Sequence, residues 1–465
     1  MFDLEGEAAP TTEQLGRLVG LLARLDDDVD DAERVEQIRA WQELQAAAAA
    51  AQAQVTAAFA VSQRAAQEAA GVPAKDVGKG IASQVGLAKR ESPFHAARYV
   101  GWATILTTEL PQTFAALQRG EVTQWRAMIV ARETGWLSAE HRGIVDAELA
   151  GRLERLGDRR TEAEAKKVAY RLDPHGAVAR ARGAAADRRV TVRPAPDTMT
   201  WLTGSLPVSQ GVAAYASLKA HADSLIAGGD RRNRGQIMAD TMVERLTGQA
   251  SADAVPATVD LVMTDRTLFN RRTTHHRTTG PAGEPADEPA HLDGYGPIPA
   301  DLARRLLTDT PADTAVWLRR LYTDPDTGAL VAMDSRCRRF DHGLRQFLVI
   351  RDQTCRTQWC DAPVRHADHP IPAAEGGPTS ASNGQGLCEA CNYAKQAQAW
   401  HARPGPGGAG QQVVTTTPTG HTYTSRPPDP PGRVVTTRPA ARAPTAPVDD
   451  THSPMEDALR RLVDK

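Results

Sequence analysis

Apolar residues recur at helical spacing through most of the first half of the chain. Residues 32–70 are rich in alanine and glutamine and contain no proline or glycine before Gly71, so they predict one long helix. Ser92 followed by Pro93 is a typical helix start, and the apolar pattern resumes directly after it. The same spacing predicts further helices at 111–118, 122–134, 138–155, 160–171, 208–227 and 234–247.

Strand patterns are fewer and shorter than the helical ones. Residues 188–206 hold two β-rich runs around a proline-containing turn, which predicts a hairpin. Residues 257–264 predict a third strand, and a helix is expected at 297–307. A strand, a turn and a second strand are expected around 317–334.

The composition changes after His401, where the chain becomes rich in proline, glycine and threonine. Such a segment buries too little apolar surface to fold, so residues 402–465 are expected to form a flexible tail. The exceptions within it are a hairpin pattern at 413–425 and a short terminal helix, for which Ser453 and Glu456 are placed as a capping box.

These patterns predict a mainly α fold with a small β component. We divide the chain into an N-terminal segment at 1–29, a mostly helical domain at 30–330, a small C-terminal module at 335–401 and the flexible tail at 402–465.

Composition and charge restrict the class of protein. The chain of 465 residues has a formal net charge of −2, so any surface that binds nucleic acid must be local. Residues 336–365 contain seven arginines against three aspartates, an excess that either meets phosphate or forms a solvated, partly paired helix face. The acidic start lacks an export signal and no run of about 18 apolar residues occurs, so we expect a cytoplasmic protein without membrane contact.

Four of the five cysteines lie within a short stretch and form two pairs. The first pair, Cys355 and Cys360, is separated by four residues, and the second, Cys388 and Cys391, is a C-x-x-C. Two such pairs suit a tetrahedral structural zinc site, with buried thiols or disulfides as the alternatives. Cys337 lies outside the pattern and is interpreted as an ordinary free cysteine.

Polar residues between and after these pairs fall into a geometric pattern. A helix that starts near Cys388 would carry both cysteines of the second pair on one face and Asn392 with Lys395 on another. Arg365 to His369 would be a strand that ends before Pro370, because proline lacks the N–H that continues a ladder. Ending the strand there would let Asp368 and His369 face one site.

The ordered run DH-x-x-P, GG, N and LC-x-x-CN-x-x-K resembles the HNH endonuclease family, which has a ββα-metal fold. The resemblance implies that His369 is the general base and that Asn383 orients it. It also implies that Asp368 and Asn392 hold one catalytic divalent ion. Asn392 replaces the family's usual histidine, and its neutral oxygen suits Mg²⁺ or Mn²⁺.

The function implied is metal-dependent hydrolysis of DNA phosphodiester bonds, with Lys395 and Arg365 as contacts to the nucleic acid. Two alternatives stay open: a non-cleaving nucleic-acid-binding zinc protein, and an interaction protein built around the helical domain. The presence of an intact site favours the enzyme. His366 is interpreted either as a solvent-facing strand residue or as a supporting neighbour of the metal ligands.

The larger N-terminal part resembles a mostly helical domain of unknown function that commonly precedes HNH modules in actinobacterial proteins. Residues 110–123, residues 294–307 and the predicted hairpin at 188–206 carry this resemblance, which extends over most of 30–330. It implies no chemistry. Target recognition or partner binding is the role suggested for the domain, and no protein partner is predicted.

Overall fold

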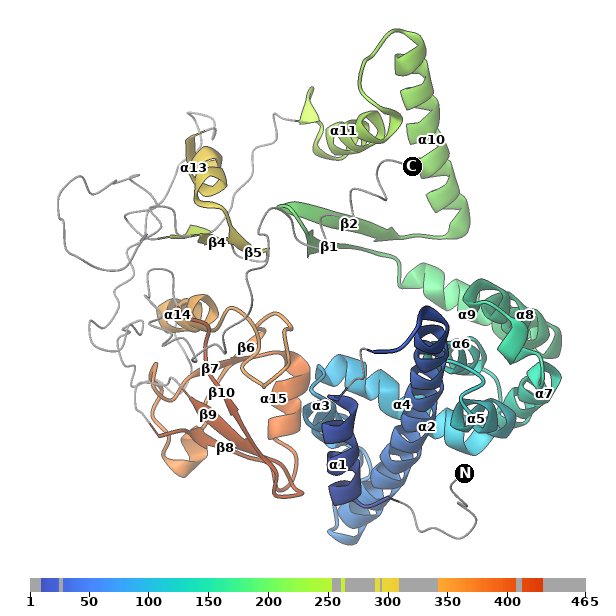
Figure 1. Ribbon diagram of the computed structural model, residues 1–465. Helices are drawn as coiled ribbons and strands as arrows, with labels where there is room; N and C mark the ends of the chain where they lie inside the picture. Colours follow the sequence, from blue (N-terminus) through green and yellow to red (C-terminus); the bar gives the residue numbers. More distant parts are fainter. Residues whose placement is uncertain are drawn as a thin grey trace.

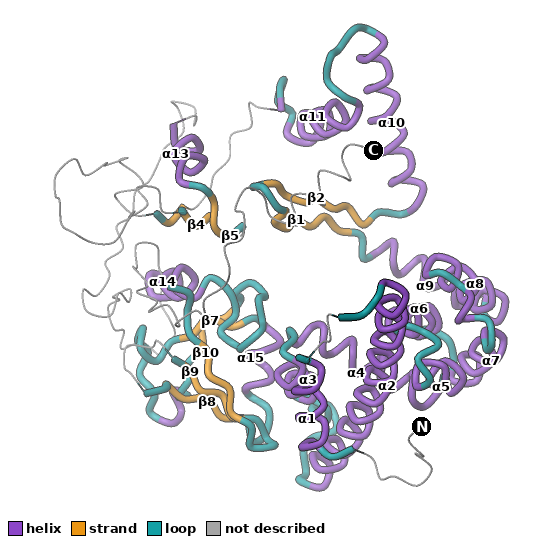
Figure 2. The backbone as a smooth tube through the Cα atoms, viewed as in Figure 1, coloured by secondary structure: helices purple, strands orange, loops and turns teal. Residues whose placement is uncertain are grey.

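The structure, a computed structural model, describes residues 10–24, 28–252, 261–263, 289–292, 295–308, 342–406 and 412–429. Helices dominate this described part, and its strands form four small antiparallel sheets (Figures 1 and 2). The expected fold class, mainly α with a small β component, is therefore confirmed.

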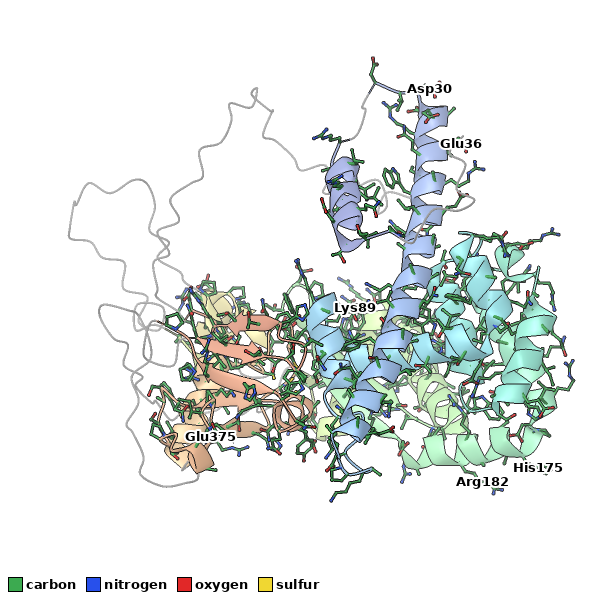
Figure 3. All side chains as sticks on the ribbon, turned by 90° about the horizontal axis from the view of Figure 1, so that it is seen from below. Asp30, Glu36, Lys89, His175, Arg182 and Glu375 are labelled. Atoms are coloured by element: carbon green, nitrogen blue, oxygen red, sulfur yellow. The ribbon has the colours of Figure 1, made fainter. Side chains whose placement is uncertain are left out.

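The predicted long helix is present as α2 (Asp31–Ala69). The Asp30 side chain caps its start by accepting a hydrogen bond from the amide of Glu33, and this end of the helix projects beyond the bundle (Figure 3). Further along, a stripe of small residues is buried against the neighbouring helices: Ala46, Ala49, Ala50, Ala53, Ala57 and Ala60. Among the described helices, α2 alone is long and apolar enough to cross a membrane, yet its alanine stripe lies in the core of the bundle.

Further helices and one 3₁₀ turn make up the rest of the N-terminal part, and those from α3 to α8 supply the bundle around α2. They are α1 (Thr12–Leu22), α3 (Ile81–Lys89), α4 (Pro93–Glu109), α5 (Pro111–Gln118), α6 (Gln124–Thr134), α7 (Ala139–Leu149), the 3₁₀ turn η1 (Leu153–Arg155), α8 (Asp158–Leu172) and α9 (Pro174–Ala186). Leu106, Leu110 and Leu117 are fully buried at the centre. The helices predicted at 111–118, 122–134 and 160–171 are confirmed, and α3 and α9 are additions that the apolar spacing did not indicate.

A buried carboxylate replaces the missing cap at the start of α5, where the capping position is a leucine. Asp146 of α7, 1% exposed, accepts hydrogen bonds from the amides of Gln112 and Thr113 at 2.6 and 2.9 Å. It also accepts one from the Thr113 hydroxyl at 2.6 Å. The first turn of α5 has no intrahelical partners for its N–H groups, so this contact fixes α5 against α7.

The predicted hairpin at 188–206 is also confirmed. Strands β1 (Arg189–Ala195) and β2 (Met199–Ser205) pair antiparallel through a tight turn in which Asp197 and Thr198 both have φ of +59°. After it come α10 (Val208–Ala227), α11 (Arg234–Thr247), β3 (Leu261–Val262), β4 (Ala290–Leu292), β5 (Gly296–Ile298) and α13 (Ala300–Thr308). The strand and turn pattern at 317–334 lies outside the described residues.

The C-terminal module is built from short elements. They are α14 (His342–Asp352), β6 (His366–Asp368), the 3₁₀ turn η3 (Ala373–Glu375), β7 (Gln385–Leu387), α15 (Glu389–Lys395), β8 (His401–Pro404), β9 (Val413–Thr416) and β10 (Thr422–Ser425). Antiparallel β6 and β7 followed by α15 form the ββα unit, and β6 is one residue shorter at each end than the strand expected from Arg365 to His369.

Part of the segment expected to be flexible after residue 401 is folded. Strands β8, β9 and β10 form an antiparallel sheet, and its β9–β10 hairpin is the one predicted at 413–425. The sheet packs on the loop between Cys355 and Cys360, since the rings of Tyr423 and Trp359 meet edge to face with centroids 5.9 Å apart. Valine, threonine and tyrosine favour strands β9 and β10, whereas β8, with the sequence HARP, was not predicted. The terminal helix lies outside the described residues.

A buried ion cluster holds the C-terminal module together. Asp352, 1% exposed, pairs with Arg351 at 2.7 Å and with Arg356 at 3.0 Å, and it accepts a hydrogen bond from the amide of Gly386. The Arg356 guanidinium also donates to the carbonyl of Ser425. The suggestion that the arginines of 336–365 meet phosphate therefore fails for these two, which serve the fold instead.

Candidate active site

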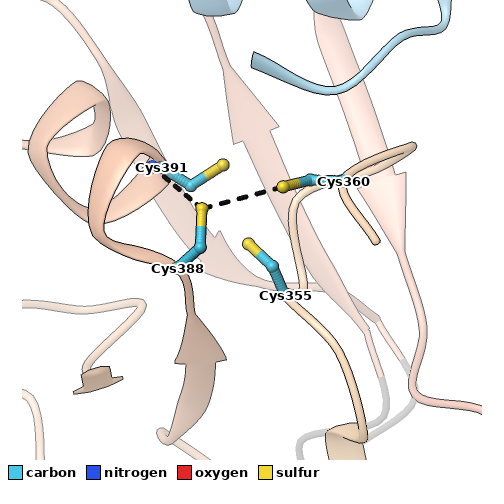
Figure 4. A group of neighbouring side chains, drawn as sticks. All are labelled: Cys355, Cys360, Cys388 and Cys391. Carbon is cyan, nitrogen blue, oxygen red and sulfur yellow. Dashed lines mark hydrogen bonds between the residues drawn. The ribbon is translucent and has the colours of Figure 1, made fainter. Parts of the chain in front are cut away.

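The four clustered cysteines meet at one buried point (Figure 4). Their sulfurs all lie within 4.8 Å of one another, and the Sγ atoms of Cys360 and Cys388 are 3.7 Å apart. A tetrahedron with zinc–sulfur bonds of about 2.3 Å has edges of about 3.8 Å, so the separation fits a bound zinc. It is too long for a disulfide bond of about 2.0 Å. Cys337 lies outside the described residues.

Local backbone structure sets the cysteines in place. The amide of Cys355 donates to the carbonyl of Ala362 at 2.9 Å, and that of Cys360 donates to Thr357 at 2.9 Å, which closes a tight loop. Cys388 caps α15, and its sulfur accepts from the Cys391 amide. The pKa of the Cys388 thiol lies well below its ordinary value, because Cys355 and the other two thiols donate hydrogen bonds to its sulfur. The same shared contacts raise the pKa of the Cys360 and Cys391 thiols, so the four sulfurs share their protons unequally.

One face of β6 lies against α15. His366 and Asp368 alternate with Ala367 along the strand, and Ala367 packs on the other side in the small core below α14. The imidazole Nδ1 of His366 is 3.2 Å from the amide nitrogen of Asn392. The ammonium of Lys395, three residues further along α15, donates to Asp368 Oδ2 at 2.7 Å. The strand and helix faces expected from sequence spacing therefore meet.

His369 comes directly after the strand and lies in a different environment from its neighbour. Its Nε2 is 2.9 Å from the hydroxyl of Thr379, a buried residue of the following loop. Burial lowers the pKa of His369, with Lys395 acting in the same direction and Asp368 opposing them. The imidazole is therefore neutral at neutral pH and able to accept a proton.

Asn383 organises the loop that carries His369 and Thr379. Its Oδ1 accepts from the amide of Ile371 at 3.0 Å, and its amide nitrogen donates to the carbonyls of Ile371 and Pro378 at 3.0 and 2.9 Å. A Cβ on Gly377 would lie 2.0 Å from the Ile371 carbonyl oxygen, so the loop closes only with glycine there. Asn383 was expected to orient the imidazole of His369. Its hydrogen bonds instead reach the backbone of the loop, so any effect on His369 is indirect.

Asn392 carries a buried polar atom without a hydrogen-bond partner. Its side chain is 7% exposed, and its Oδ1 is buried with no hydrogen-bond partner. A buried carbonyl oxygen without a partner costs free energy, and a hard divalent cation would satisfy it. Asp368 provides a carboxylate close by, held by Gln385 at 2.9 Å. The two residues fit a catalytic divalent ion.

Two residues expected to contact nucleic acid lie differently. Lys395 is enclosed, with a side chain 12% exposed that also donates to the carbonyl of His369. Arg365 is exposed, and its carbonyl accepts from Arg345 at 2.9 Å. Sequence reasoning missed Thr379 and undervalued His366. The alternation of His366 with Asp368 on one strand was the available signal.

The C-terminal module docks on the helical bundle beside this site. An open groove of about 1120 Å³ runs between the start of α4 and the zinc-binding loop, with Phe94, Trp359 and Tyr393 among its walls. The guanidinium of Arg90 lies over the Trp359 ring at 5.9 Å, and Thr419 donates to Gln84 of α3 at 3.1 Å. The helical bundle thus forms one wall next to the candidate active site.

Comparisons with known proteins agree with this arrangement. The family described as "Domain of unknown function (DUF222)" matches residues 36–352, and the HNH endonuclease family matches residues 355–398. An uncharacterised protein of Mycobacterium tuberculosis, Rv3776, is 38% identical over 87 residues, which is 18% of this chain and 16% of that protein. The similarity thus spans about a sixth of the relative's length. No solved structure matches the chain. The chain belongs to the DUF222 family, with an HNH endonuclease domain following the DUF222 domain.

Proposed function

We propose that this protein is a cytoplasmic, metal-dependent endonuclease that hydrolyses phosphodiester bonds in DNA. The HNH endonuclease domain indicates a nuclease acting on nucleic acid, and the identity of DNA as the substrate is part of the proposal. The observation that carries it is the position of His369, which follows β6 directly and whose Nε2 lies 2.9 Å from the hydroxyl of the buried Thr379.

His369 is the proposed general base. If its Nε2–H donates to the Thr379 hydroxyl, the lone pair lies on Nδ1, which would take a proton from the attacking water. Thr379 then selects the tautomer, and Asn383 holds the loop that carries both residues. The lowered pKa of His369 supports this role, because the base must be unprotonated at neutral pH.

Asp368 and Asn392 would hold the catalytic ion, Mg²⁺ or Mn²⁺, and the unpartnered Oδ1 of Asn392 supports this assignment. Such an ion would stabilise the charge that develops at the leaving oxygen. Lys395 already neutralises Asp368, so a bound ion and the ammonium would compete for one carboxylate. We propose that Lys395 and the exposed Arg365 contact the phosphates of a bound substrate.

The Cys355, Cys360, Cys388 and Cys391 set would hold a structural zinc, since all four positions belong to cysteines and none is left open for a substrate. The alternative function is a nucleic-acid-binding zinc protein that does not cleave. An unpaired ligand oxygen and a neutral, positioned imidazole favour the enzyme, because neither is required for binding alone.

Replacement of the base tests this proposal. The full chain is incubated with supercoiled plasmid and Mg²⁺, Mn²⁺, Ni²⁺ or Zn²⁺ in turn. We expect His369→Ala to slow nicking about 10²–10⁴-fold with unchanged zinc content and DNA affinity. The control is His401→Ala, which removes an exposed imidazole from β8. Equal rates for the parent and His369→Ala would refute the assignment of the base, and an inactive parent that binds DNA would support the non-cleaving alternative.

A further inference from the structure

An exposed arm extends from the helical bundle, made of α9 and the hairpin β1–β2. None of its helical or strand residues is buried, and every strand residue but Ala195 is exposed. Figure 1 shows the hairpin apart from the bundle of α2 to α8. A two-stranded ribbon with no core of its own is marginally stable at best in water, which suggests that another surface covers it in the working state.

The hairpin has two chemically different faces. Register pairs Thr191 with Thr203 and Arg193 with Trp201, and the alternation of strand residues puts Arg189 on the same face. The Arg193 guanidinium lies over the Trp201 ring at 5.9 Å. The opposite face is apolar and carries Val190, Val192 and Leu202. We call the face that carries Arg189, Thr191, Arg193, Trp201 and Thr203 the arginine face. It combines cations, hydroxyl groups and an aromatic ring.

The arm has the opposite sign of charge to the chain as a whole. Residues 174–205 contain five arginines against two aspartates, whereas the complete chain has a net charge of −2. Within the part of the chain that the structure describes, none of these five guanidinium groups forms an ion pair: Arg180, Arg182, Arg188, Arg189 and Arg193. Figure 3 shows Arg182 pointing away from the bundle.

Arginines of the neighbouring bundle behave differently. Arg126 pairs with Asp158 at 3.2 Å, and Arg152 pairs with Glu164 at 2.9 Å. Bundle arginines such as these are partly neutralised by neighbouring carboxylates, whereas the five arginines of the arm form no ion pair in the described part of the chain. A surface with that pattern complements a polyanion.

We propose that the arginine face of the β1–β2 hairpin binds duplex DNA and is a target-binding element of the DUF222 domain. This inference rests on the proposed function, because it takes the DNA cleaved by the HNH domain as the occupant. A two-stranded ribbon fits the major groove of duplex DNA, and arginine pairs with phosphate or with guanine edges there. Trp201 adds apolar contact area at the centre of the face.

The test measures DNA binding without cleavage. Full-length His369→Ala protein is titrated with a fluorescent duplex at several salt concentrations, with and without the further pair Arg189→Ser and Arg193→Ser. We expect the affinity to fall about tenfold or more. The slope of log affinity against log salt should become shallower by about 1.8 if both arginines contact phosphate. The matched control changes the opposite face of the same strand, Val190→Thr and Val192→Thr, and should bind like the parent.

Three outcomes would overturn the inference. The first is an unchanged affinity and salt slope in the arginine variant. The second is an equal loss in the valine control, which would mean that the hairpin acts through folding or through contact between two copies. The third is an equal loss on single-stranded DNA, which would mean that the groove of a duplex is not what is bound. The proposed nuclease fails differently, by binding DNA normally without cleaving it in the parent protein.

Discussion

At the scale of single residues, Asn392 is the departure from the family pattern with the clearest physical consequence. Its Oδ1 is buried without a partner, so a cation would relieve a cost that the protein otherwise bears. We expect Asn392→Asp to bind Mg²⁺ or Mn²⁺ more tightly, because it adds a negative charge, and Asn392→Ala to bind more weakly. Cleavage rate measured against metal concentration checks this. Identical metal titrations for both variants and the parent would remove Asn392 from the ligand set.

Thr379 gives a second prediction at this scale. Thr379→Val keeps the shape of the side chain and removes the hydroxyl that bonds His369 Nε2. We expect kcat to fall about fivefold, as for one net hydrogen bond of about 1 kcal/mol, with little change in KM. Thr379→Ser restores the hydroxyl and should recover most of the rate. A serine variant as slow as the valine variant would mean that Thr379 only fills space.

Sequence spacing identified the residues whose roles depend on near neighbours, and it missed those that depend on loop closure. The cysteine pairs and the Asn392–Lys395 face follow from helical geometry over a few residues. Thr379 meets His369 only because Asn383 fixes the intervening loop. Likewise, Lys395 of α15 and Asp368 of β6 are 27 positions apart in the sequence, so no local pattern predicts their ion pair.

At the scale of secondary-structure elements, the four clustered cysteines join two segments that have little core of their own. Cys355 and Cys360 follow α14, and Cys388 and Cys391 belong to the start of α15. We expect Cys391→Ser to lose zinc and to unfold the C-terminal module, since a structural zinc supplies much of a small module's folding energy. Elemental analysis and limited proteolysis check this, with Cys337→Ser as the control. Full zinc content in Cys391→Ser would contradict the four-cysteine site.

The elements that were predicted well from the sequence have regularly spaced apolar residues and recognisable capping or turn residues at their ends. Alanine-rich α2 and the Ser92-Pro93 start of α4 are examples, and so is the β1–β2 hairpin with its turn. The β8–β10 sheet was only partly foreseen, because β8 pairs with β9 across the connecting residues 405–412 and the sheet also packs on Trp359. Helix α3 was missed because its capping residue is Gly80, at φ of +82°.

At the scale of the whole molecule, the helical domain and the C-terminal module form a joint site region and not two separate units. The walls of the groove come from both parts. Helix α3, besides packing on α4, contacts the C-terminal module through Gln84 with Thr419 and through Gly80 with Trp400. The DUF222 domain is thus placed to influence how nucleic acid approaches His369. Because the helical domain and the C-terminal module contact each other here, we expect a change in one of them to alter the dynamics of the other.

Trp400 is the residue that tests this joint. Its side chain is 8% exposed, and a Cβ on Gly80 would lie 2.6 Å from its indole nitrogen, so the ring packs directly on the backbone at the start of α3. Trp400→Ala should cost about 3–5 kcal/mol locally, as for other buried large-to-small changes. We expect faster hydrogen exchange of the α3 amides while zinc stays bound. Trp125→Ala, at a position 51% exposed, is the control and should leave exchange unchanged. Unaltered protection of α3 in Trp400→Ala would show that the two parts are coupled elsewhere.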